Sequence, residues 1–112
     1  LILDIDNILI SLDTITTCGL IVNELVSNSL KYAFPNNRKG QIKIALHATD
    51  GDEMELRIID NGIGLPEGLD FRNTKSLGLK LVKWLAEDQL EGTVRLKTIK
   101  GTDFLIKFKE TT

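Results

Sequence analysis

The chain has 112 residues, enough for one domain with a single hydrophobic core. It is 42% hydrophobic and 27% charged with a net charge of −2, the balance of a soluble globular protein without a polyanion-binding surface. No apolar run approaches the roughly 20 residues of a membrane span, and the first residues do not form a signal peptide. Cys18 is the single cysteine, which excludes an internal disulfide and favours a reducing cytoplasm.

The first half of the chain predicts a strand, a helix and a hairpin. Residues 8–12 are short, β-branched and apolar, which predicts an edge strand. Thr16 or Thr17 is expected to cap a helix that runs to about Ala33. Residues 41–48 alternate between apolar and polar, and after the turn at 50–52 a second strand returns, which predicts a hairpin.

The second half predicts a loop, a helix and another hairpin. Residues 60–76 hold three glycines and a proline, and so long a loop in a small domain is typically functional. Ser76 is expected to cap a helix whose apolar residues at helical spacing are Leu77, Leu81, Val82 and Leu85. A final hairpin is expected from residues 93–99 and 103–109. Together the elements predict an α+β fold, a two-layer sandwich with helices on one face of a mostly antiparallel mixed sheet.

The first helix carries three polar residues on one face. At 100° per residue, Glu24, Asn28 and Lys31 lie together. The opposite, core-facing arc is expected to contain Val22, Leu25, Val26, Leu30 and Ala33, with Ser29 inside it. The residues that flank the polar trio are Leu20, Ile21 and Tyr32. An apolar rim around polar groups is typical of a binding site.

The trio suits a magnesium–phosphate ligand. Asn28 offers a neutral oxygen for Mg²⁺, which prefers oxygen ligands and keeps several waters. Lys31 can meet phosphate oxygens as a point charge, and Glu24 can orient a water or accept a proton. Taken alone, the helix is equally consistent with an ordinary solvent-exposed face, on which Glu24 and Lys31 are surface charges and Asn28 has no special role.

Two glycine segments add to this pattern. In residues 60–64, Gly62 and Gly64 permit close backbone approach to a ligand, and Asp60 is placed to accept a hydrogen bond from a ring amine. Residues 76–79 lie at a helix start, where backbone N–H groups favour phosphate. Taken singly, each segment is equally consistent with a capped turn or a capped helix.

In order and spacing together the motifs are specific. The chain carries, in succession, N-E-L-x-x-N-x-x-K-Y, D-N-G-x-G, S-L-G-L and G-T-x-F. This set resembles the ATP-binding domain of sensor histidine kinases, members of the GHKL superfamily with the Bergerat fold. The resemblance extends from about Leu12 to Phe108. The stretch GLIVNELVSNSLKYAFP is especially similar to the short-lid subfamily that is often linked to PAS domains.

The resemblance implies catalytic roles on the first helix. Asn28 matches the Mg²⁺-binding Asn of the family's N box, and Glu24 matches the acid one turn before it. Lys31 and Tyr32 match the pair that contacts the phosphates and the nucleotide. Glu24, Asn28 and Lys31 are therefore the implied catalytic residues.

The resemblance also implies a nucleotide-binding set outside this helix. Asp60 matches the Asp that recognises adenine, and Thr102 matches a residue near the adenine end. The matching glycine-box residues are Gly62 and Gly64 in the first box and Ser76, Leu77, Gly78 and Leu79 in the second. The second box departs from the family pattern, because it has one glycine where many members have several.

The implied function is binding of Mg²⁺-ATP and transfer of its γ-phosphate in two-component signalling. The acceptor would be a histidine on a separate helical dimerisation domain of the same parent protein, and a response regulator would be an indirect partner. His47, the single histidine, is expected on the outer side of a strand and is not the acceptor. We expect residues 1–112 to be one monomeric, cytoplasmic domain of a longer protein that is either soluble or membrane-anchored. This domain itself is expected to contact neither nucleic acid nor membrane.

Two alternatives stay open. A degenerate module that binds nucleotide or docks without phosphotransfer is favoured by the reduced second glycine box, but disfavoured by intact Asn28, Lys31 and Asp60. Another GHKL member, an ATPase or a serine kinase, is disfavoured by the K-Y-A-F-P ending of the helix and by the segment between Pro66 and Ser76, which is short for an ATP lid.

Overall fold

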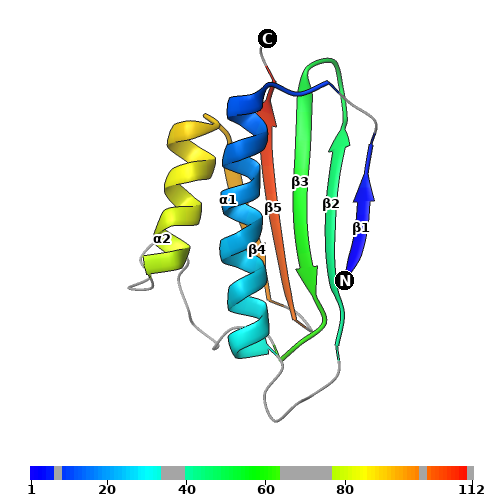
Figure 1. Cartoon of the computed structure of the whole chain (residues 1–112), viewed down its shortest axis with the longest axis vertical. Helices are drawn as coiled ribbons and strands as arrows, with labels where there is room; N and C mark the ends of the chain where they lie inside the picture. Colours follow the sequence, from blue (N-terminus) through cyan, green and yellow to red (C-terminus); the bar gives the residue numbers. More distant parts are fainter. Residues whose placement is uncertain (7–8, 34–39, 64–76, 99–100, 111–112) are drawn as a thin grey trace.

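Two helices cover one face of a five-stranded sheet (Figure 1). The computed structural model describes residues 1–6, 9–33, 40–63, 77–98 and 101–110. The strands lie in the order β1-β2-β3-β5-β4. Their bounds are β1 Ile2–Ile5, β2 Ile42–Ala48, β3 Glu53–Asp60, β4 Thr93–Lys97 and β5 Thr102–Lys109. The helices are α1 (Leu12–Asn28) and α2 (Leu77–Trp84), which continue into short π-helical segments, η1 (Ser29–Ala33) and η4 (Leu85–Gln89). The predicted α+β sandwich is confirmed.

The two predicted hairpins are confirmed, and their alternating residues build the core. β2 and β3 are antiparallel neighbours, as are β4 and β5, while β3 and β5 pair at the centre of the sheet. One row of buried side chains crosses four strands through the pairs Leu46–Leu56, Leu56–Ile106 and Ile106–Val94. Full burial of a residue such as Leu56 or Ile106 stabilises the fold by about 1.5–3 kcal/mol.

The edge strand lies earlier in the chain than predicted. β1 is Ile2–Ile5 and pairs in parallel with β2, with Ile2 opposite Lys43. The predicted strand at 8–12 is wrong in its described part, because residues 9–11 have no regular structure and Leu12 begins α1. A short apolar run is ambiguous on its own, and pairing with β2 decides which segment becomes the strand.

The N-terminal cap of α1 also differs from the prediction. Ser11 is the cap, and its Oγ accepts a hydrogen bond from the Thr14 amide at 3.2 Å. Thr16 and Thr17 lie inside the helix, where their hydroxyls donate to the carbonyls of Leu12 and Asp13 four residues earlier. Threonine hydroxyls can satisfy themselves in this way within a helix, so a threonine near a helix start need not be its cap.

The buried face of α1 is rotated slightly from the predicted arc. Cys18, Ile21, Leu25 and Ser29 are buried, and Val22 and Val26 pack partly buried against the core. Ile21 was expected at the rim but is fully buried, whereas Leu30 was expected in the core but is 64% exposed. Leu30 follows the change from α1 to the π-helical η1, so a rotation of 100° per residue no longer describes its direction. The side chain of Ala33 lies outside the described residues.

The second helix is confirmed, but one residue of its predicted apolar face is exposed. Leu79, Val82, Leu85 and Ala86 are buried, and Leu81 packs partly buried against them. Leu77, at the first position of α2, is 82% exposed. The predicted cap Ser76 lies outside the described residues. No helix in the described ranges is long and apolar enough to cross a membrane.

Cys18 is a packing residue of α1. It is 2% exposed, and burial, followed by the charge of Glu110, raises the pKa of its thiol to about 12. A thiol with such a pKa stays protonated near neutral pH and is a poor nucleophile.

His47, on β2, contacts two aspartates in and just after the edge strand β1. Its Nε2 lies 3.1 Å from Oδ2 of Asp4, and its Nδ1 lies 3.0 Å from Oδ1 of Asp6. Both ring nitrogens therefore face acceptors, which suits the doubly protonated imidazolium. Hydrogen bonding to Asp6, followed by that to Asp4, raises the pKa of His47, and the same bond lowers the pKa of Asp6. The expected surface position of His47 is confirmed.

This cluster predicts a pH-dependent attachment of β1. The contribution of His47 is fully present below about pH 6.5 and is lost as the pH rises through its raised folded pKa. The contribution of Asp6 is present above about pH 4 and is lost as the pH falls through its lowered folded pKa. The difference in melting temperature between the wild type and His47→Gln should therefore shrink as the pH is raised through the His47 pKa. A difference that stays constant to alkaline pH would contradict this assignment.

Candidate active site

A buried carboxyl group lies where β3 ends. Asp60 is the last residue of β3 and is 3% exposed. Its Oδ1 accepts hydrogen bonds from the amides of Gly62 at 3.0 Å and Thr102 at 3.2 Å. Its Oδ2 accepts from the hydroxyls of Thr102 at 2.6 Å and Ser29 at 2.7 Å. A carboxyl group offers about four acceptor positions, so the protein itself occupies all of them.

The local sequence around Asp60 explains this arrangement. The bond from the Gly62 amide folds residues 60–62 into a tight turn in which an Asp side chain replaces a backbone carbonyl. Thr102 is the first residue of β5 and lies opposite Asp60 in the sheet. Gly101, just before it, has a φ of +110°, and an added Cβ would lie 2.1 Å from the Asp60 carbonyl oxygen. The G-T sequence at 101–102 therefore brings β5 against the end of β3.

Ser29 is a site residue that sequence reasoning missed. The helical pattern placed it in the core arc, and it is indeed buried at 6% exposure. Its hydroxyl donates to Asp60 and so joins η1 to the sheet. A polar residue within an apolar arc requires a buried partner, and this requirement was the available signal.

The polar face of α1 packs against the start of α2. Glu24 and Asn28 are half-buried. A Cβ built on Gly78 would lie 2.8 Å from Oε2 of Glu24, 3.7 Å from Nδ2 of Asn28 and 3.9 Å from Oδ1 of Asn28. The structure thus brings together Glu24 and Asn28 from the first motif and Gly78 from the second glycine box.

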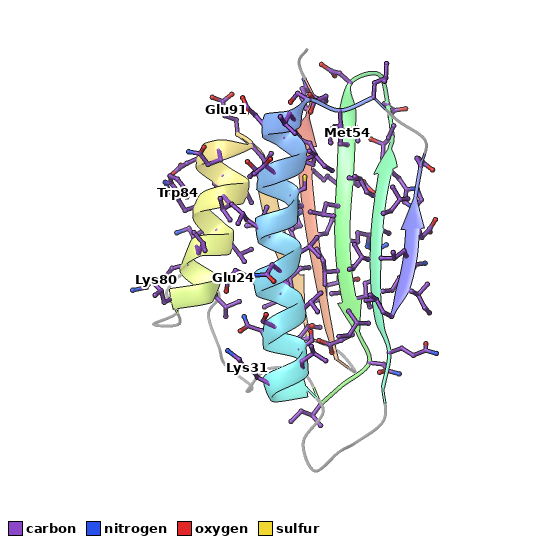
Figure 2. The ribbon with its side chains drawn as sticks, in the orientation of Figure 1. Glu24, Lys31, Met54, Lys80, Trp84 and Glu91 are labelled. Carbon is purple, nitrogen blue, oxygen red and sulfur yellow. The ribbon has the colours of Figure 1, made fainter. Side chains whose placement is uncertain are left out.

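Lys31 lies one turn beyond Asn28, in η1. It is exposed, and Figure 2 shows it near the end of the helix, beyond Glu24. Within the described ranges its ammonium group forms no ion pair. It is therefore available to a ligand charge.

Other predicted site residues are placed less directly. Leu77 is exposed at the start of α2, whereas the Leu79 side chain is buried at 5% exposure in the core. Gly62 is buried beside Asp60. The predictions for Gly64, Ser76 and the Tyr32 side chain lie outside the described residues.

The donors on α1 fit a magnesium ion bound together with a polyphosphate. Asn28 presents an amide oxygen near Gly78, with the Glu24 carboxyl group close to the same glycine, and Mg²⁺ prefers oxygen ligands. In the described ranges no group of three or more His, Cys, Asp or Glu side chains could hold a metal. Mg²⁺ usually keeps several waters and is bound through one or two protein groups together with substrate phosphates.

The site has two chemically different ends, one where η1 meets the ends of β3 and β5 and one on the polar face of the first helix. At Ser29, Asp60 and Thr102 it offers buried acceptors and two hydroxyls that can rotate, which suits a ring that donates hydrogen bonds. At Glu24, Asn28 and Lys31 it offers oxygen ligands and a cation, which suits a metal-bound polyphosphate. A helix-on-sheet sandwich with this buried Asp and this polar helix face is the arrangement expected from the resemblance of the motifs to histidine kinase-type ATPase domains.

Comparison with known families agrees with this class. Residues 14–112 match the sequence model of the histidine kinase-, DNA gyrase B-, and HSP90-like ATPases. The match covers most of the chain, and the chain belongs to this family. The recognition made from the motifs is confirmed.

Several relatives are histidine kinases. The chain is 29% identical over 98 residues to the sensor histidine kinase PdtaS of Mycobacterium tuberculosis, covering 85% of this chain and 19% of that protein. It is 28% identical over 82 residues to blue-light-activated histidine kinase 2 of Erythrobacter litoralis, covering 73% of this chain and 24% of that protein. The histidine kinase domain of the Erythrobacter litoralis EL346 blue-light activated histidine kinase superimposes with a TM-score of 0.87 at 25% identity, over 96% of this chain and 50% of that one. The chain therefore spans about a fifth to a quarter of these curated relatives.

Proposed function

We propose that this chain is the ATP-binding catalytic domain of a sensor histidine kinase and one domain of a longer protein. It binds Mg²⁺-ATP and donates the γ-phosphate to a histidine on a separate helical dimerisation domain. The observation that carries the proposal is the buried Asp60, bonded to Ser29 and Thr102 and adjoining a polar helix face that suits a metal-bound polyphosphate.

Each end of the site has its own role in this proposal. The Ser29 and Thr102 hydroxyls can rotate, so an amine of the adenine ring can donate to Asp60 in place of one of them. Asn28 holds Mg²⁺, which neutralises phosphate charge when bound. Lys31 contacts phosphate oxygens, and Glu24 orients the polar groups around them. Tyr32, Gly64 and the backbone of residues 76–79 complete the nucleotide site.

The reaction in this proposal is a phosphoryl transfer. A nitrogen of the acceptor histidine forms a bond to the γ-phosphorus while the bond to the leaving ADP oxygen breaks. Positioning and charge neutralisation carry most of such a reaction. The acceptor domain belongs to the same parent protein, and a response regulator receives the phosphate later. The ATP-binding domain itself works as a monomer in the cytoplasm.

The experiment that tests the proposal has two steps. Calorimetric titration with a non-hydrolysable ATP analogue is expected to show binding that strengthens with Mg²⁺, and Asn28→Ala should lose this Mg²⁺ dependence. The domain, supplied with ATP and a histidine-bearing helical domain from its parent, should then transfer phosphate to that histidine. Binding without transfer would leave a degenerate nucleotide-binding module, and transfer to serine of a partner protein would indicate a serine kinase.

A further inference from the structure

We propose that Gly78 is a positioning residue of the phosphate end. The space left by its missing side chain holds the Glu24 carboxyl group and thereby fixes Glu24 beside Asn28. This inference rests on the proposed function for its consequence in nucleotide binding, but the contact itself can be tested without nucleotide.

Gly78 is required for space rather than for backbone conformation. In the described ranges, positive φ occurs at Gly51 and Gly101 among the glycines, and Gly78 lies within the regular helix α2. Glycine inside a helix costs stability relative to alanine, so its presence needs another reason. The reason is the Glu24 carboxyl oxygen, which lies 2.8 Å from the position that a Cβ would take.

The surrounding packing decides which group would move. Leu79, the next residue of α2, is 5% exposed and lies in the same core cluster as Ile21 and Leu25 of α1. The start of α2 is therefore anchored to α1 by buried apolar contacts. The group in the way of a Cβ is the end of a flexible side chain, so Glu24 moves rather than the helix. A side chain at position 78 should consequently leave the fold intact and displace Glu24 from Asn28.

Gly19 provides a matched control on the same helix pair. It also lies inside a helix, but a Cβ there would meet nothing within 4 Å. Gly19→Ala should raise the melting temperature through helix propensity alone, and by the same amount whether residue 24 is Glu or the shorter Asp. Gly78→Ala should raise it less in the wild type than in the Glu24→Asp background, where the carboxyl group is withdrawn by one methylene.

Nucleotide binding gives the second measurement. Residues that orient a metal ligand typically change metal affinity by roughly ten- to a hundredfold when altered. Gly78→Ala should weaken binding of a non-hydrolysable ATP analogue by about that factor in the presence of Mg²⁺, and less without it. In the Glu24→Asp background, Gly78→Ala should reduce the affinity for the analogue by a smaller factor than it does in the wild type. The shorter Asp side chain leaves room for the added methyl group.

The outcomes separate this inference from the proposed function. If the wild type binds no analogue, the proposed function fails, and the thermal measurement still decides on the contact between Gly78 and Glu24. If Gly78→Ala and Gly19→Ala raise the melting temperature equally in both backgrounds, the inference is overturned, whatever the wild type binds. A change in Mg²⁺-dependent affinity within about twofold, the size of ordinary non-additivity, would overturn the positioning role.

Discussion

Replacing Asp60 with asparagine is expected to weaken binding of an ATP analogue by roughly 10- to 150-fold, equivalent to ~1.5–3 kcal/mol for a hydrogen bond to a charged group. The amides of Gly62 and Thr102 can donate only, so they should hold the oxygen of the new side chain at the Oδ1 position. Its NH₂ group then replaces Oδ2, facing the Ser29 and Thr102 hydroxyls.

This substitution should affect the ligand far more than the fold. The two hydroxyls can turn to accept from the new NH₂ group, so the buried bonds are largely retained. The amine of adenine, however, would meet a donor instead of an acceptor. Guanine presents an acceptor oxygen at the corresponding ring position, so the ratio of ATP to GTP affinity should fall.

Calorimetric titration of both nucleotide analogues, with circular dichroism to verify folding, measures this effect. Ser29→Ala is the matched control, because it removes one donor to Oδ2 while leaving the acceptor in place. It should weaken ATP binding much less than Asp60→Asn does. A folded Asp60→Asn variant that binds ATP as the wild type does would contradict the assignment of Asp60 to the adenine end.

Gly101→Ala is expected to destabilise the fold more than Gly19→Ala, Gly51→Ala or Gly78→Ala. A Cβ at this position would lie 2.1 Å from the Asp60 carbonyl oxygen and 3.1 Å from Cα of Asn61. These are backbone atoms of the central strand and its turn, which cannot move aside cheaply. The φ of +110° is also unfavourable for any residue with a side chain. Overpacking and backbone strain together should cost about 2–6 kcal/mol.

Gly51→Ala provides the comparison. Gly51 also has a positive φ, +56°, but a Cβ there would meet nothing within 4 Å. Its cost should be limited to the left-handed conformation, roughly 1–2 kcal/mol. Urea unfolding of both variants measures the difference. Equal midpoints for Gly101→Ala and Gly51→Ala would show that the close approach of Gly101 to Asp60 does not constrain the fold.

The sequence predicts the fold wherever a periodic pattern faces a single core. The alternation of Ile42, Ile44 and Leu46 identified β2, and all three residues are buried. The predictions fail where several segments could form the same strand, or where several residues could cap the same helix. β1 is defined by pairing with β2 about 40 residues away, and the start of α1 by a serine that competes with two threonines for the cap.

The sequence names candidate site residues, and the structure places some of them together through connections that the sequence did not predict. Glu24 and Asn28 share a helix face, as periodicity requires, and Gly78 lies against both. The role of Ser29 depends on which side chain lies opposite a buried hydroxyl, and only the packing of η1 on β3 fixes that partner. The exposure of Leu30 depends on the π-helical turn, and a prediction that assumes 100° per residue throughout does not include such a turn.

The central pairing of β3 with β5 also bears on how this chain folds. The bond between Asp60 and Thr102 joins residues 42 positions apart, with α2 and β4 in the intervening sequence. Contacts so distant in sequence slow folding, because a long loop must close before they form. During synthesis, β3 can pair with β2 as soon as it has emerged, but it gains its second partner only after β5 has emerged. The proposed adenine end of the site is therefore completed only when β5 joins the sheet, and a chain that stops before β5 should lack both the complete sheet and this end of the site.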